Sequence, residues 1–423
     1  MTRPTITVEV ALQTEPTEAP VWADVTAYVR GAIDIRRGRQ RELDRMEAGT
    51  LALALDNRDR RFDPLYEDGP YYGLLLPMRR IRVRCETQDP RGPGYYVPFG
   101  LFCGYIEAWT PRYEARDAWV EVQASDGFKV LAMTRLNGDW PSQDTGARID
   151  AVLSAVGWTT GESWVLDSAV NGLLGDTTVL GPVGDRIIMD GQTKVIATTL
   201  EDAPALGHIQ EMAQLETGVF FIDYDGEARF YNRFRTIRYG TQLYNVFNND
   251  GPPDRTAPFS EIEIEYDDAL IYNEVRIARQ DGDEQVATDT ASQVSYFVRT
   301  LQWSGLPLIT DDDAFQLAHY LLGRYKQPAP RVSRLGLRAP LSAIAWYIVL
   351  CNDLGDDIFI YWQPPGGGDP IYFGRSLLQG ISHRIDQERW EIQLWLAPHD
   401  PNRYWWLDYP MGSNLGTTTR LAL

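Results

Sequence analysis

The sequence has little lysine and far more acidic than basic residues. Lys129, Lys194 and Lys326 are the only lysines, so nearly all of the 40 basic residues are arginines. Arginine pairs with carboxylates through two parallel hydrogen bonds, and its excess fits either many such pairs or a GC-rich genome. The 59 acidic residues bring the formal net charge to −19, which repels phosphate backbones and also favours solubility. We therefore expect no tight nucleic-acid binding.

Cysteine and histidine are equally scarce. Cys85, Cys103 and Cys351 lie far apart without a CxxC pair, which excludes a disulfide framework and a zinc knuckle and argues against an iron–sulfur cluster within one chain. We expect buried thiols, and a contact between Cys85 and Cys103 across a hairpin is the alternative. The four histidines show no metal-ligand spacing. The stretch DYDG at 223–226 has half the acids of a calcium loop and is better explained as a hairpin turn.

Catalytic motifs and long apolar runs are missing too. The sequence contains no GxSxG and no HExxH, and the glycine-rich stretch at 364–370 lacks the Lys-Ser/Thr of a phosphate loop. No segment approaches the roughly eighteen apolar residues of a membrane span. The first residues, MTRPTITVEVAL, lack the apolar core of a signal peptide. We therefore expect a protein without catalysis, cofactor, metal or stable membrane insertion, made in the cytoplasm of its host.

Aromatic residues, in contrast, are plentiful. With 13 Trp, 22 Tyr, 14 Phe and 44% hydrophobic residues, the composition excludes global disorder. Short alternating segments separated by turns predict a mainly β fold of barrel or sandwich type. The clearest predicted strands are TITVEVAL, LALAL, RRIRVRCE, PFGLFCGYIEAW, AWVEVQASD, FSEIEIEYDDALIYNEVRIARQ, SRLGLRAP, WYIVLCN, DDIFIYW, IYFGRSLLQGISHRID and RWEIQLWLAP.

Helical periodicity is confined to three segments. RIDAVLSAVGW at 148–158 and APALGHIQEMAQLET at 203–217 carry apolar stripes, and a hairpin with a two-residue Asp225-Gly226 turn follows the second. Residues 140–235 therefore predict a small α+β unit. The third helix spans 309–328, with Asp311 or Asp312 as its N-cap.

A cluster of charges directly follows the predicted strand LALAL. Leu51, Leu53 and Leu55 share one face of that strand, and the loop NRDRRFDP comes next. We expect Arg58, Arg60, Arg61 and Asp63 to hold this loop in place, with Phe62 as an apolar pin in a local core. The loop then either docks on a neighbour or is only a solvated surface, where ion pairs contribute little.

The order of these pieces resembles the minor tail proteins of long-tailed bacteriophages, specifically the tail-hub or baseplate-hub family. The segments that carry the resemblance span most of residues 1–400. They are 22–64 (ending in AGTLALALDNRDRRFDP), FGLFCGYIEAWTP, VQASDGFKVL, RIDAVLSAVGW, EMAQLETGVFFIDYDGEARFYNR, YNEVRIARQDG, LLGRYKQPAPRVSRLGL, LGDDIFIYWQPPGG and LLQGISHRIDQERWEIQLWLAP.

The resemblance implies a mainly β fold in which two related hub-type β-barrel domains flank a small α+β domain. The implied domains are residues 1–138, 139–255 and 256–400, followed by an extension at 401–423. A loose echo between FCGYIEAW and LLQGISHRI fits a duplicated barrel. In the extension, Tyr404, Trp405 and Trp406 would either anchor an arm on a neighbouring subunit or pack on their own barrel.

The resemblance also implies a role in the virion. A tail hub forms a homotrimeric ring that closes the tail tube, contacts the distal tail protein, the tape measure protein and the tip, fibre or receptor-binding proteins, and opens so that DNA passes through its lumen. Two alternatives stay open: a distal tail or receptor-binding protein, and a glycan-degrading tail hydrolase.

Overall fold

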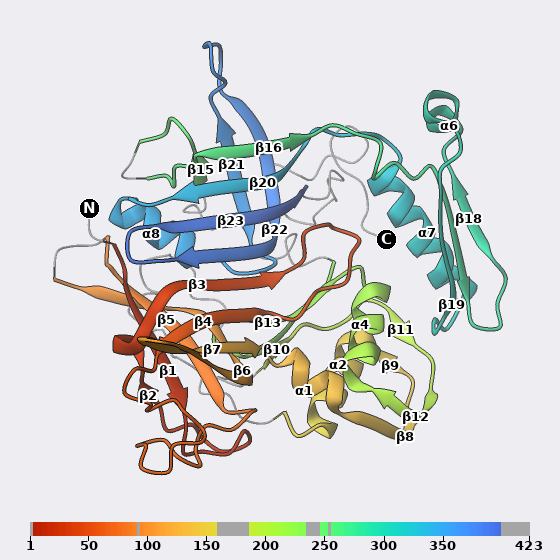
Figure 1. The fold of residues 1–423 in the computed structure, drawn as a ribbon. Coiled ribbons are helices and arrows are strands. Elements are labelled where there is room, and N and C mark those ends of the chain that lie inside the picture. The colour runs from red at the N-terminus through yellow and green to blue at the C-terminus, as the bar shows by residue number, and fades with distance from the viewer. Residues whose placement is uncertain (1–2, 91–93, 159–185, 234–245, 253–254, 399–423) are drawn as a thin grey trace.

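The main sheet of the protein joins strands from the two ends of the chain. The structure, a computed structural model, describes residues 3–90, 94–158, 186–233, 246–252 and 255–398 (Figure 1). Neighbouring strands of the sheet follow the order β16-β20-β23-β22-β3-β4-β7-β6-β5-β1-β2, and β21 pairs with both β15 and β22. The early strands are β1 (Thr5–Ala11), β2 (Ala23–Asp24), β3 (Val29–Gly38), β4 (Thr50–Asp56), β5 (Arg80–Gln88), β6 (Tyr96–Glu114) and β7 (Asp117–Ser125), with a 3-10 turn at Thr26–Tyr28.

The late strands form the second β-rich part. They are β15 (Val246–Asn248), β16 (Glu261–Glu265), β20 (Arg331–Arg338), β21 (Asp357–Trp362), β22 (Ile371–Ile385) and β23 (Trp390–Pro398). The two parts meet where β3 pairs antiparallel with β22, from Ile33 opposite Ile385 to Gly38 opposite Gly380. This pairing merges the two parts into one sheet, which is visible where the red and blue strands run side by side (Figure 1).

An α+β unit lies between the two β-rich parts in the sequence. It contains α1 (Phe128–Met133), β8 (Arg135–Trp140), β9 (Gln143–Asp144), α2 (Thr145–Ala155), β10 (Arg186–Ile188), β11 (Lys194–Val195), β12 (Thr198–Pro204), α4 (Ala205–Leu215), β13 (Val219–Ile222) and β14 (Ala228–Tyr231). Apolar side chains of its helices, among them Ile149, Leu153, Ile209 and Met212, are fully buried in its core.

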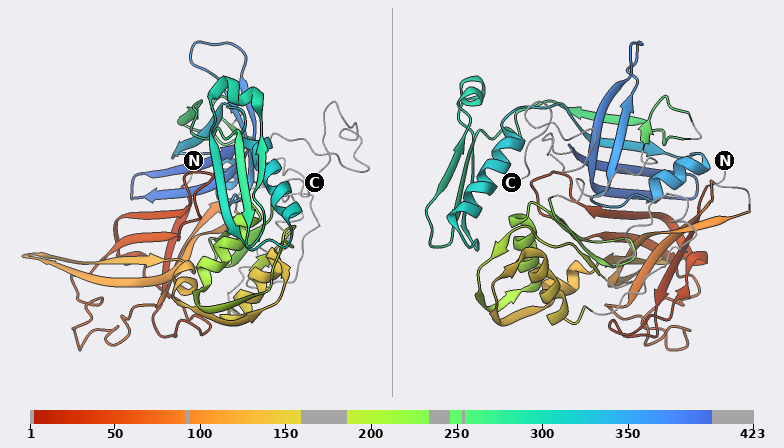
Figure 2. Two further views of the ribbon diagram at one scale, coloured as in Figure 1. Left: turned by 90° about the vertical axis from the view of Figure 1, so that its right-hand side faces the viewer. Right: turned by 180° about the vertical axis from the view of Figure 1, so that it is seen from behind.

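A further α/β unit interrupts the second β-rich part. It consists of β17 (Glu274–Arg279), β18 (Gln285–Thr288), α6 (Thr290–Tyr296), β19 (Thr300–Leu306) and α7 (Asp311–Tyr325). In Figure 1 and in the right view of Figure 2 this unit stands at the edge of the molecule, with α7 against its three-stranded sheet. Leu317 and Leu321 of α7 are buried and belong to the same apolar cluster as the core of the first α+β unit.

The predicted fold class is confirmed: the protein is mainly β, with an α+β unit between two related β-rich parts. The alternating strand LALAL is β4, and its leucines are buried while Ala52 is exposed. The similar segments FCGYIEAW and LLQGISHRI lie on β6 and β22, the two longest of the described strands. Each strand has a register shift, between Ile106 and Ala108 in β6 and between Leu378 and Gly380 in β22.

Some local predictions were wrong. WYIVLCN is not a strand: Ala343–Leu350 form helix α8, because a continuous apolar run fits a buried helix as well as a buried strand. The N-cap of α7 is Thr310 rather than Asp311 or Asp312. Its hydroxyl accepts the N–H of Asp313 at 3.1 Å, while the Asp313 carboxylate accepts the N–H of Thr310 at 2.9 Å.

Two further expectations need correction. The β13–β14 turn is longer than two residues, because Ile222 pairs with Ala228 and the N–H of Asp223 donates to the carbonyl of Glu227 at 2.9 Å. Cys85 and Cys103 do not face each other, since Cys85 lies opposite Phe99. Both thiols are free and buried, as the main expectation stated.

Candidate assembly site

The charged loop after β4 is built on one buried asparagine. The N–H of Asn57 donates to the carbonyl of Ala118 at 2.9 Å, and its side-chain oxygen accepts the N–H of Phe62 at 2.8 Å. The N–H of Arg60 returns to the carbonyl of Asn57 at 2.9 Å, in a left-handed backbone conformation with φ +61°. The first bond ties the start of the loop to β7, and the other two fold the loop back onto Asn57, so the loop has a defined shape.

Phe62 points from this loop into the core of the first β-rich part. Its side chain is 0% exposed. Its ring lies 5.5 Å from that of Tyr28, 5.5 Å from that of Tyr71 and 6.4 Å from that of Trp109, measured between centroids. Aromatic pairs at such distances stabilise beyond the area they bury.

The charges of the loop are paired within the loop. Arg60 binds Asp63 at 2.8 Å, Arg61 binds Asp59 at 2.7 Å, and Arg58 binds Asp56. Burial alone would raise the pKa of Asp63, but hydrogen bonds from the Leu65 backbone and from Arg60 outweigh it, so this pKa lies below its usual range. Only Asp63 of these acids is buried; the others lie in partly or fully open positions where an ion pair contributes little.

Two of the three loop arginines, Arg58 and Arg60, also face a surface groove. Arg58, Arg60 and Leu65 line it together with Tyr113 and the turn between β6 and β7. The side chain of Leu65 is 83% exposed and that of Tyr113 57%. The structure thus brings Arg58, Arg60, Arg61, Phe62 and Asp63 together, while Tyr404, Trp405 and Trp406 lie outside the described residues. The interface role of both groups stays a prediction.

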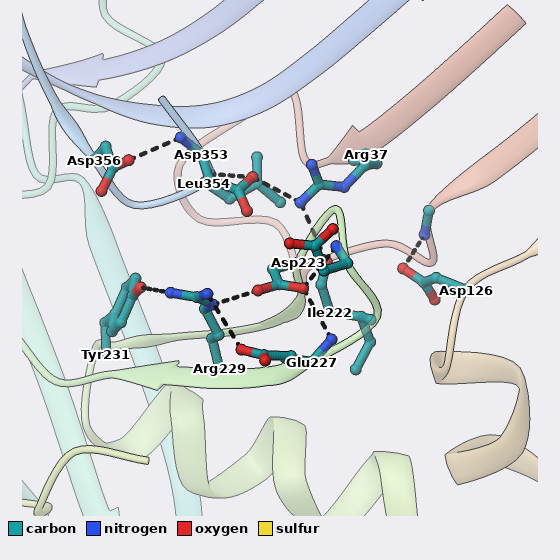
Figure 3. A network of polar contacts seen from close by, with 12 residues as sticks. Arg37, Asp126, Ile222, Asp223, Glu227, Arg229, Tyr231, Asp353, Leu354 and Asp356 are labelled. Carbon is teal, nitrogen blue, oxygen red and sulfur yellow. Dashed lines mark hydrogen bonds and ion pairs between the residues drawn. The ribbon is translucent and has the colours of Figure 1, made fainter. Parts of the chain in front are cut away.

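A second polar cluster, which the sequence did not reveal, lies where the α+β unit meets the two β-rich parts (Figure 3). Its centre is Asp223, at the start of the β13–β14 turn. Its carboxylate accepts the N–H groups of Asp225 and Glu227 at 2.9 and 2.8 Å and the guanidinium of Arg229 at 2.6 Å. Both oxygens of the Asp223 carboxylate therefore accept hydrogen bonds from protein groups. Among the described residues no group of three or more His, Cys, Asp or Glu side chains is arranged to hold a metal ion.

An ion pair joins the two β-rich parts at the same place. Arg37, near the end of β3, donates to Asp353 at 2.6 Å and to the carbonyl of Ile222 at 3.3 Å (Figure 3). The side chains of Arg37 and Asp353 are only 5% and 11% exposed. One arginine therefore contacts the second β-rich part and the β13–β14 turn together. No sequence pattern links residues 316 positions apart, so only a contact prediction could have found this pair.

The turn of β13 and β14 packs directly on β6. A Cβ atom at Gly100 would come within 2.5 Å of the Tyr224 ring and within 2.6 Å of the Asp225 carboxylate, so only glycine allows this approach. Half-buried beside β6, Asp225 has a pKa raised well above its usual range, by desolvation first and then by the charges of Asp223 and Glu227. Burial likewise raises the pKa of Asp353, although Arg37 opposes it. The cluster is therefore an acidic site compensated by two arginines. It is called the junction cluster below and consists of Arg37, Asp223, Asp225, Glu227, Arg229 and Asp353.

Asp126, at the end of β7 beside the junction cluster, gives a pH-dependent prediction. Its carboxylate accepts the N–H groups of Gly49 at 2.6 Å and Phe128 at 2.9 Å, and burial raises its pKa to about 7. A carboxyl whose folded pKa exceeds its unfolded value, about 3.9, stabilises at low pH, and this contribution is lost as pH rises through the folded pKa. Between pH 5 and pH 8 the free energy of unfolding should fall by about 2–3 kcal/mol through this group.

Urea unfolding at both pH values checks this. The Asp126→Asn variant should lack that part of the decline, whereas Asp369→Asn, at an exposed position of the β21–β22 loop, should retain it. Equal pH dependence in wild type and Asp126→Asn would contradict the assignment.

The arrangement of the elements is that of a fold known from solved structures of tail proteins. The 43 kDa tail protein of prophage MuSo2 from Shewanella oneidensis matches with a TM-score of 0.54 at 12% sequence identity, over 94% of this chain and 98% of that one. The tail protein from Neisseria meningitidis MC58 matches with a TM-score of 0.53 at 10% identity, over 93% and 96%. At these identities the likeness establishes a shared fold, and at that level the resemblance indicated by the sequence is confirmed.

Sequence comparison adds nothing to this result. No protein-family model and no curated protein matches the chain. No helix in the described ranges is long and apolar enough to span a membrane.

Proposed function

We propose that the chain is a structural protein of a bacteriophage tail, the hub at the distal end of the tail tube. The observation that carries the proposal is the fold shared with two tail proteins, one of them from a prophage, which extends over more than nine-tenths of each pair of chains. A likeness of this extent covers both β-rich parts and the units between them. It leaves little of these 423 residues for an appended hydrolase, which argues against a glycan-degrading role.

In this proposal three copies form a ring that closes the tube. The ring contacts the distal tail protein and the tape measure protein on one side and the tip, fibre or receptor-binding proteins on the other. The net charge of −19 supports a conduit for DNA, because an acidic lumen would let a polyanion pass without holding it. Boundaries at residues 138, 255 and 400 remain the proposed domain limits.

The test is the mass of the purified chain in solution, measured over a range of concentrations, with negative-stain images of the same samples. A trimeric ring with a central opening is the expected result, because closed rings follow from rotational symmetry of identical contacts. A hexameric ring would favour the alternative of a distal tail protein. Two results together would contradict the proposal: a chain that stays monomeric at every concentration, and an antibody against the chain that does not bind the tail tip of virions.

A screen on peptidoglycan and bacterial polysaccharides separates the hub from a tail hydrolase. No release of reducing ends is expected. If the activity that releases reducing ends co-purifies with the chain through every chromatographic step, the result would instead support the hydrolase.

A further inference from the structure

The two most exposed large apolar side chains of the described residues lie in α6 and directly after it. Val294 in the helix is 88% exposed, and Phe297, the first residue after the helix, is 85% exposed. Val298, next in the chain, is 59% exposed. These three residues form an apolar tip on the unit that stands at the edge of the molecule (Figure 1), and they are called the α6 tip below.

The backbone holds Phe297 outward in a conformation that is costly for a bulky residue. Its φ is +61° and its ψ is 173°, a region that is essentially restricted to glycine. The buried Asn273, directly before β17, fixes this conformation. Its amide group donates to the carbonyl of Phe297 at 2.8 Å and to Ser292 Oγ at 3.2 Å, and its side-chain oxygen accepts the N–H of Arg299 at 2.9 Å. Backbone strain of this kind is concentrated at functional sites, so the exposed position of Phe297 indicates a function for the tip.

The charges beside the α6 tip are compensated. Between Val286 and Arg299 only Asp289 and Arg299 are charged. Asp289 binds Lys326 at 2.9 Å, and Arg299 binds Asp268. Two copies of a chain with a net charge of −19 repel each other, so contacts between copies are favoured at faces whose charges are balanced. The α6 tip is such a face.

A second face with these properties is the surface groove beside the loop after β4. The groove has a volume of about 600 Å³. It exposes Leu65 and Tyr113, at 83% and 57%. Its charged lining residues are balanced, with three arginines and three acids. These are Arg58, Arg60, Arg116, Asp63, Glu114 and Asp117. An apolar tip that enters this groove therefore covers Leu65 and Tyr113 without bringing an excess of charge of one sign together.

The α6 tip and the groove lie at opposite ends of the molecule. In Figure 1, α6 is at the upper right and the loop between β4 and β5 at the lower left, and the two elements are also well separated in both views of Figure 2. The groove that the tip enters therefore belongs to another copy. Two different faces at opposite ends give a head-to-tail contact, which closes into a ring when the rotation between copies allows it.

We infer that the α6 tip of one copy inserts into the groove of the next copy. The inference rests on the ring of three copies proposed above and assigns one of its contacts. Val294 and Phe297 cover Leu65 and Tyr113 of the partner subunit, and the same contact is repeated around the ring. Exposed aromatic and apolar side chains of this kind act as anchors within a larger interface.

Disulfide linking between two variants tests the contact. Val294→Cys places a thiol on the tip, and Leu65→Cys places one in the groove. A mixture of the two variants should form linked pairs under mild oxidation, whereas each variant alone should stay unlinked, because the contact joins two different faces. Met133→Cys on α1, at a position that is 64% exposed, is the matched control for Val294→Cys and should link to Leu65→Cys roughly tenfold less. The wild-type chain, whose three thiols are free, measures the background.

The mass of the same samples separates this contact from the ring itself. A ring that forms without a link between positions 294 and 65 would overturn the contact and leave the ring standing. Linked pairs of Val294→Cys alone would also overturn it, because they would show that two tips pack on each other. A chain that forms no oligomer would overturn the ring and the inference together.

A substitution at Phe297 gives a second measurement without introduced cysteines. Glycine adopts the backbone conformation at this position without strain, so Phe297→Gly should keep the wild-type midpoint of urea unfolding or exceed it. It should need a concentration roughly tenfold higher for assembly, because the buried ring is missing from the contact. Met133→Ser should assemble like the wild type. Unchanged assembly of Phe297→Gly would contradict the inference. Loss of binding to another tail protein with assembly intact would also contradict it, because that protein would then be the occupant of the tip.

Discussion

The Arg37→Met variant is expected to lose about 3–5 kcal/mol of the free energy of unfolding, because it leaves the buried Asp353 carboxylate without its cation. Arg37 is 5% exposed and donates to Asp353 at 2.6 Å, and the same guanidinium group holds the carbonyl of Ile222. Removal of one partner of a buried pair costs far more than the pair itself contributes, since the remaining charge stays desolvated. The midpoint of urea unfolding measures the loss.

The neighbouring arginine provides the control for this prediction. Arg36 lies one residue earlier on β3, and its pair with Glu47 at 3.4 Å is exposed on both sides, at 44% and 62%. Arg36→Met should change the free energy of unfolding by less than about 0.5 kcal/mol.

The pH dependence of the Arg37→Met variant follows from Asp353. The Arg37 charge opposes the effect of burial, which raises the pKa of Asp353. Without Arg37 this carboxyl takes up a proton more readily, so the loss should be smaller at pH 5 than at pH 8. A loss that is equal for Arg36→Met and Arg37→Met, or independent of pH, would contradict the role given to the junction cluster.

The second large effect is expected for Phe62→Ala, at about 3–5 kcal/mol. The ring is fully buried and contacts Tyr28, Tyr71 and Trp109, so truncation leaves a cavity among three aromatic rings. The loop backbone, held through Asn57, limits how far the site can collapse. Thermal or urea unfolding of the variant measures the loss.

Leu65→Ala is the matched control, three residues further along the same loop. Its side chain is 83% exposed, so the substitution should change stability by less than about 0.5 kcal/mol. A loss below about 1 kcal/mol for Phe62→Ala would show that the loop is a solvated surface rather than a part of the core. If Leu65→Ala weakens assembly of the oligomeric ring without loss of stability, the groove beside the loop takes part in the contact between copies.

Sequence reasoning succeeded where the pattern is local. The alternation of LALAL predicted a half-buried strand, and the apolar stripes of 148–158 and 203–217 predicted helices that the structure contains as α2 and α4. It failed at α8, whose run AIAWYIVL is apolar on every side and therefore has no period to interpret. It also misplaced the N-cap of α7, because aspartate is as good a cap as threonine and three aspartates directly follow Thr310. The structure shows that the Thr310 hydroxyl accepts the capping hydrogen bond.

The junction cluster shows the limit of such reasoning. The sequence by itself determined that the fold is mainly β, that the loop at 56–63 carries self-compensating charges around one phenylalanine, and that the DYDG stretch is a turn. It did not determine what that turn packs against, since Gly100, Arg37 and Asp353 come from segments far apart in the chain. Pairing of β3 with β22 brings those segments together, and burial then shifts the pKa of the carboxyl groups. Periodicity and turn chemistry act over a few residues, whereas desolvation and ion pairing depend on distances in space, which only the tertiary structure decides.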